Sequence, residues 1–217
     1  MPTVLQLPDI IGWKQVQFDP IQPRDVDRME GRRTEAQIFG TPWWRGTWQA
    51  GWLNEIDYGK MDAFMMRAGG MGEVFRAYDP FRPRPIAHDN GQPLSGTNAG
   101  GGPFNGTAVI TARTATTLSI SGLPANFQFR AGDYVEVVKS ATVISLHRII
   151  EDVQATSGGT VVLTIRYALD LQTFTLPLTA NFEKPSCLMQ IDAGSYQGQK
   201  SWGSRSPSFS ATEVFYS

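Results

Sequence analysis

The sequence predicts a mainly β protein with one α-helix, and three observations favour this class. Glycine and proline are frequent, with 22 and 14 residues among 217, as is typical of a chain with many tight turns. β-Branched and aromatic residues recur in short alternating runs. A helical repeat of apolar residues, followed by glycines, is evident only in residues 54–70. A chain of this length can bury a sufficient core without covalent cross-links.

The first third of the chain is expected to begin with strands and loops. Residues 10–18 predict a first strand, with a bulge because its apolar positions do not alternate perfectly. Residues 19–33 are polar and contain two prolines, which favours a loop. Residues 34–53 form the longest strand candidate.

Four of the six tryptophans fall within residues 42–52. The glycines and threonine of this segment argue against a helix, so we interpret it as a strand whose side chains alternate between two faces. Trp43 and Arg45 then lie on a polar face, and we predict them as a candidate subunit interface. The predicted buried face consists of Trp44, Gly46, Trp48, Ala50 and Trp52.

Residues 54–70 predict the helix. Asn54 can cap it, and Asp57 is an acidic residue in the first turn, where it favours helix formation. Met61, Phe64 and Met65 follow at helical spacing, so we expect them to cover the tryptophans, although a methionine-rich stripe can also form an adaptable binding surface. A short strand is expected shortly after the helix, before Pro80.

The remainder of the chain predicts two domains. Residues 81–106 are rich in proline and glycine and are predicted to be a linker. Residues 107–189 contain about five short alternating segments separated by turns, which favours an inserted small β-barrel or β-sandwich module. Residues 190–217 end in an alternating segment that we expect to pair back onto residues 1–80.

Composition and motifs argue against several function classes. A net charge of −1 offers no basic excess for phosphates, so we expect no nucleic-acid specificity. Neither a secretory signal nor a long apolar segment is present, so we expect no membrane insertion. The single cysteine, Cys187, excludes an internal disulfide and is expected to be buried.

Residues for catalysis are not evident either. His88 and His147 are the only histidines, and neither belongs to a metal-binding spacing or a nucleophile motif. We interpret His147 as a strand residue with a local hydrogen bond. We therefore predict no catalytic, cofactor-binding or metal-binding residues, and no enzyme activity.

The order of these elements resembles that of the distal tail proteins, and more broadly the minor tail proteins, of long-tailed bacteriophages and prophages. The similarity covers nearly the whole chain, and the segments that carry it best are AGDYVEV, LHRIIEDV and FEKPSCLMQID. The resemblance implies a viral structural protein of the virion tail, assembled in the cytoplasm of the bacterial host. Residues 1–80 plus 190–217 would form a β-sandwich ring domain, and residues 107–189 an outer module.

The implied function is a hexameric ring at the distal end of the tail tube. Such a ring would contact the tail tube protein on one side and the tail tip, hub or baseplate proteins on the other. Two alternatives stay open: a carbohydrate-binding module for receptor attachment that uses tryptophans as stacking platforms, and a hydrolase that cuts cell-wall or capsule glycans.

Overall fold

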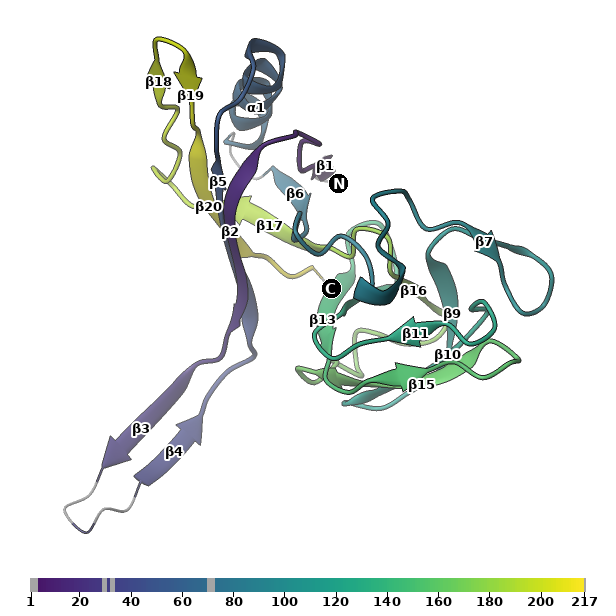
Figure 1. The fold of residues 1–217 in the computed structure, drawn as a ribbon. Coiled ribbons are helices and arrows are strands. Elements are labelled where there is room, and N and C mark those ends of the chain that lie inside the picture. Colours follow the sequence, from purple (N-terminus) through teal and green to yellow (C-terminus); the bar gives the residue numbers. More distant parts are fainter. Residues whose placement is uncertain (1–3, 29–30, 32–33, 70–72, 217) are drawn as a thin grey trace. The chain divides into compact units, whose positions relative to one another are not determined.

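The computed structural model describes residues 4–28, 31, 34–69 and 73–216 (Figure 1). Its described part is mainly β with a single α-helix, as the sequence predicts. Of the two modules expected, a barrel or a sandwich, it contains a closed barrel. The chain divides into two compact units. Unit 1 consists of Met1–Leu7, Phe75–Leu188 and Phe215–Ser217, and unit 2 consists of Pro8–Val74 and Met189–Val214.

Antiparallel strands form the sheet of unit 2. β5 (Trp43–Ala50) pairs with β2 (Trp13–Ile21) on one side and with β20 (Ser208–Glu213) on the other. The last three residues of β17 (Cys187–Ile191) pair with β20. The strands of unit 2 follow the order β17-β20-β5-β2. β1 (Val4–Gln6) belongs to unit 1, as does β6 (Val74–Ala77) except for its first residue. The C-terminal segment thus pairs with β5, as expected from its alternation.

A two-stranded ribbon continues from β2 and β5 (Figure 1). It consists of β3 (Arg24–Arg28) and β4 (Thr34–Ile38). The loop predicted over residues 19–33 is therefore wrong where β2 and β3 lie, and its residues 29–30 and 32–33 are outside the described part of the chain. The strand predicted over residues 34–53 is divided into β4 and β5. Pro20 is tolerated because β2 is an edge strand, and Gly40, with φ +90°, interrupts the second segment between β4 and β5.

Helix α1 (Glu55–Ala68) follows the predicted pattern. The Asp57 amide donates a hydrogen bond to the Asn54 side chain at 2.8 Å, which caps the first turn. Lys60 forms an ion pair with Asp57 at 2.8 Å. The buried face of the helix comprises Asp57, Tyr58, Met61, Phe64, Met65 and Ala68.

Stacked aromatic rings form the core of unit 2. Trp44 stacks on Phe18 with centroids 5.1 Å apart, and Trp48 stacks on Phe209 at 5.2 Å. Phe64 of α1 approaches Phe209 at 6.2 Å, so helix and sheet share this core.

The prediction that Trp52 belongs to this core is wrong, because 68% of its surface is exposed. β5 ends at Ala50, and the alternation that buries Trp44 and Trp48 does not continue beyond the strand. The Trp52 indole N–H instead donates to the Gly203 carbonyl oxygen.

Gly46 makes room for the largest side chain of this core. Both Gly46 and Trp48 face inward, and a Cβ added at Gly46 would overlap the six-membered ring of Trp48. The indole therefore lies over the backbone of its own strand, which requires glycine at this position.

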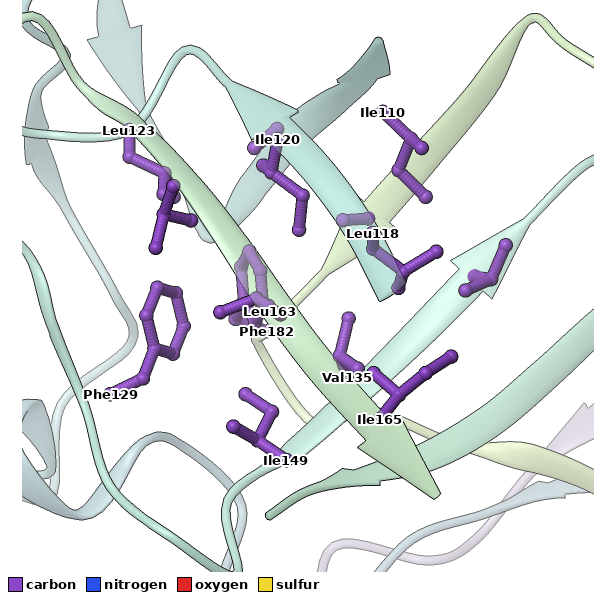
Figure 2. Packing of buried hydrophobic residues seen from close by; sticks show 14 of the residues in the cluster. Ile110, Leu118, Ile120, Leu123, Phe129, Val135, Ile149, Leu163, Ile165 and Phe182 are labelled. Carbon is purple, nitrogen blue, oxygen red and sulfur yellow. The ribbon is translucent and has the colours of Figure 1, made fainter. Parts of the chain in front are cut away.

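Unit 1 contains the closed barrel, with strand order β10-β15-β13-β12-β16-β9. Figure 2 shows its interior, where Leu118, Val135 and Leu163 are fully buried. The bounds of the strands are β9 Thr107–Arg113, β10 Thr117–Ser121, β12 Tyr134–Val138, β13 Ile144–Ile149, β15 Thr160–Arg166 and β16 Leu178–Asn181. Short elements complete the unit: η1 Ile86–His88, β7 Gly96–Thr97, β8 Pro103–Phe104, β11 Gln128–Phe129 and β14 Val153–Gln154.

Residues 81–106, expected to be a linker, are packed within unit 1. Arg84 is 8% exposed and pairs with Glu183 at 2.7 Å, and the His88 ring stacks on Phe127 at 3.8 Å. Phe104 joins the barrel core. We call residues 81–106 the covering segment, because they pack against the barrel. Contacts with residues distant in sequence hold this segment in place.

We predict that Gly46→Ala lowers the free energy of unfolding by about 1–3 kcal/mol, the usual cost of overpacking a core. Chemical denaturation monitored by tryptophan fluorescence measures this change. The control is Gly59→Ala on α1, where an added Cβ meets no atom within 4 Å. This control should be neutral or stabilising by up to about 1 kcal/mol. Equal stability of Gly46→Ala and wild type would contradict the packing described for Trp48.

Candidate assembly surface

Trp43 and Arg45 lie on the face of the unit 2 sheet opposite the aromatic core. Trp43 is half-buried and pairs with Ile21 at the end of β2. Arg45 lies between Asp19 on β2 and Thr212 on β20 in the strand register, and its side chain is 56% exposed. The structure thus brings the two predicted residues together on one strand, whereas their contact with another subunit stays a prediction.

Asp192 orders the polar groups beside Arg45. The Ser210 hydroxyl donates to its carboxylate at 2.6 Å and the Thr212 hydroxyl at 2.7 Å, and the Arg45 guanidinium lies 3.6 Å away. The outer face of the sheet is therefore a fixed hydrogen-bonded layer of short side chains, which suits contact with another protein surface.

Glu213 lies on the opposite, buried face of the same sheet. It is 8% exposed, and the Trp44 amide donates a hydrogen bond to its carboxylate at 2.8 Å. Burial raises the pKa of Glu213 to about 8, because this one hydrogen bond offsets little of the desolvation of the charge. The alternation of Glu213 with Phe209 and Ala211 is the sequence signal that indicates its buried position.

Exposed apolar side chains gather where β2 begins and β5 ends. We call this surface the tryptophan end: Ile11, Trp52, Ile56 and Trp202, which are 91%, 68%, 74% and 106% exposed. The hairpin of β18 (Lys200–Ser201) and β19 (Ser204–Arg205) carries Trp202. The Leu53 amide donates to the Arg205 carbonyl at 3.0 Å, which holds this hairpin beside the start of α1.

The β3–β4 ribbon occupies the other end of the same strand pair. β2 and β5 close with the pair Ile21 and Trp43, and β3 and β4 follow. All ten residues of β3 and β4 are exposed. Unit 2 therefore presents two unlike surfaces at opposite ends of one strand pair.

Hydrogen-bond donors compensate the loss of hydration of the buried carboxylates in unit 1. Glu136 is fully buried and accepts hydrogen bonds from Arg76, Asn181 and the Ser186 amide. Asp133 accepts from the Ile86 amide at 3.0 Å. These networks fix the covering segment and strands around the barrel, which is a structural role.

The histidines of unit 1 are held by protein contacts. His147 is 3% exposed, with Nε2 2.9 Å from the Ser145 hydroxyl and Nδ1 2.9 Å from the Tyr167 carbonyl oxygen. Burial lowers the pKa of His147 to about 4, so the ring is neutral at pH 7. A serine–histidine pair can activate a nucleophile, but this imidazole is closed off from solvent. The predicted local hydrogen bond of His147 is confirmed, as is the burial of Cys187.

The described residues of each unit line a hollow. In unit 1 a hollow of about 280 Å³ is lined by His88, Ser95, Thr97 and Asn126, among others. The His88 Nε2 accepts a hydrogen bond from the Gln128 amide at 3.1 Å. In unit 2 a second hollow of about 280 Å³ lies between α1 and the residues that follow β17.

No protein-family model matches the chain, and no curated protein matches it. Among the described residues, no group of three or more His, Cys, Asp or Glu side chains is arranged to hold a metal ion. In the same part of the chain, no helix is long and apolar enough to cross a membrane.

We predict that Glu213→Gln flattens the pH dependence of stability. The pKa of Glu213 in the folded chain, near 8, lies above its ordinary value of 4.5. The protonated carboxyl therefore contributes its full stabilisation of the folded state below pH 4.5, and this stabilisation is lost as pH rises through 8. The slope in that window is at most about 1.4 kcal/mol per pH unit. The variant, which keeps an acceptor for the Trp44 amide, should melt at a higher temperature than wild type at pH 8.5.

Thermal melts followed by circular dichroism between pH 5 and 8.5 measure this effect. Glu151→Gln, which removes an exposed carboxylate of unit 1, is the matched control substitution. A Glu213→Gln profile as steep as that of wild type would show that Glu213 does not titrate in this window.

Proposed function

We propose that this chain is a structural component of a phage or phage-like tail. In this proposal it forms a ring, hexameric by resemblance, at the distal end of the tail tube and connects the tube to the tail tip or baseplate. The observation that carries the proposal is the pair of unlike exposed surfaces at opposite ends of β2 and β5: the tryptophan end and the β3–β4 ribbon.

A ring that connects two structures needs one surface for contact between its own subunits and another for a different protein. Large apolar side chains such as Trp52 and Trp202 are unfavourable in water and are common anchors of protein interfaces. The ribbon has no core of its own, and a two-stranded ribbon alone is only marginally stable. Both ends therefore favour contact with other proteins. We assign the tryptophan end to the tail tube protein or the tail tip and hub proteins, and the ribbon to a neighbouring copy of this chain.

The lateral surface of such a ring would be the outer face of the unit 2 sheet. Trp43 and Arg45 lie there beside the ordered Asp192 layer. Repeated head-to-tail contact between identical subunits closes a ring when the rotation permits. The chain would act in the virion tail after assembly in the host cytoplasm.

Sedimentation velocity of the purified chain tests the ring directly. We expect a discrete oligomer that shows a closed ring in negative-stain images and that binds tail tube protein. A strictly monomeric chain at high concentration, with no binding to tube protein, would overturn the proposal.

We predict that Trp43→Ser raises the dissociation constant of the oligomer at least tenfold, as expected for loss of an aromatic anchor worth about 1.4 kcal/mol or more. The monomer should stay folded, because Trp43 lies outside the aromatic core. Sedimentation and thermal melts give the two readouts. Trp202→Ser is the matched control: the ring should persist while binding to tube or tip protein weakens. Unfolding of Trp43→Ser would contradict the assignment of its face.

A carbohydrate-binding role in receptor attachment is the second candidate, and the exposure of Trp52 and Trp202 favours it. Exposed indoles provide the flat apolar surface on which sugar rings stack. Titration of host cell-wall oligosaccharides tests this candidate, because saturable quenching of tryptophan fluorescence that is lost in Trp202→Ser would support it. An unchanged fluorescence signal in wild type would exclude it in favour of a protein partner.

A further inference from the structure

We infer that the β3–β4 ribbon binds a second copy of this chain, with the acidic face of one ribbon against the basic face of the next. The inference rests on the proposed ring and names the surface that assembles it. It follows from the strand register and from where the charges fall within it.

The register sorts the ribbon side chains into two faces. Directly opposed residues in an antiparallel pair share a face, and alternate residues along a strand do so too. Asp25 is opposite Gln37, and Asp27 is opposite Glu35. These four residues form the acidic face. The basic face consists of Arg24, Val26, Arg28, Thr34, Ala36 and Ile38.

Each face is unfavourable on its own. The acidic face carries carboxylates and no cation, and its Asp27 and Glu35 are directly opposed, an arrangement that destabilises an antiparallel pair. The basic face carries two guanidinium groups and no carboxylate, and it exposes Val26 and Ile38 at 44% and 59%. A partner surface of opposite charge would relieve the repulsion on either face and cover the apolar groups.

The chain itself supplies the complementary surface. Because the two faces of one ribbon carry opposite charges, the acidic face of one copy can pair with the basic face of the next copy. Stacking across a two-fold axis would place acidic on acidic or basic on basic face and is disfavoured. Head-to-tail stacking pairs opposite charges at every contact, and such heterologous contacts generate rings or filaments. Charge sorting on the ribbon thus favours a ring over a simple dimer.

Two charge-reversed variants test this pairing in the full chain. Arg24→Glu/Arg28→Glu makes both faces acidic, and Asp25→Lys/Asp27→Lys/Glu35→Lys makes both faces basic. Each variant alone should repel itself, with its oligomer dissociation constant raised at least tenfold in sedimentation velocity. An equimolar mixture should regain the wild-type oligomer, because every contact can then join an acidic face to a basic one.

The control reverses two exposed cations of the barrel, Lys139→Glu/Arg166→Glu, and should assemble like wild type. Thermal melts confirm that all variants fold. Wild-type-like assembly of each ribbon variant alone would overturn the inference and leave the proposed ring standing. Dissociated variants that fail to associate on mixing would likewise overturn it, in favour of a different partner for the ribbon. A wild-type chain that is monomeric under the same conditions would overturn the ring and this inference with it.

Discussion

The packing of Trp48 over Gly46 is the contact on which the rest of unit 2 depends. Trp48 is fully buried, and its indole touches partners from both neighbouring strands: Phe209 on β20 at 5.2 Å and Phe18 on β2 at 5.8 Å. One side chain therefore joins three strands and fixes which face of β5 points inward. Since side chains alternate strictly along a strand, this choice also places Trp43 and Arg45 on the outer face. The candidate assembly surface is a consequence of the core.

The same constraint explains why the two ends of unit 2 differ. Alternation controls side chains only as far as the strand extends, and β5 spans Trp43–Ala50. Beyond Ala50, Trp52 leaves the core and contributes to the tryptophan end. Beyond the pair of Ile21 and Trp43, the ladder resumes as β3 and β4 with no core beneath it. Both exposed surfaces lie where the chain extends beyond the aromatic core.

The parts of the fold that local patterns determine were predictable. The cap of α1, its apolar stripe and the alternating barrel strands each follow from neighbours within a few residues. The ribbon was missed because the hydrophobic pattern that identifies strands is weak there: its alternation is one of charge, with Arg24 and Val26 on one face and Asp25 and Asp27 on the other. The linker predicted over residues 81–106 is packed within unit 1 by pairs such as Arg84 with Glu183, which join positions 99 residues apart and which local composition does not indicate.

Trp43 connects the lateral surface with the ribbon. The pair Ile21 and Trp43 closes the β2–β5 ladder, and the first ribbon pair, Arg24 and Ile38, follows after a short break in each strand. A second copy stacked along the ribbon would therefore reach the half-buried indole of Trp43 on the outer face of the sheet, at the base of the ribbon. Charge pairing on an exposed ribbon is weak when taken alone, because solvent and salt screen it. In the proposed assembly, Trp43 at the base of the ribbon would supply the apolar contact that charge alone lacks.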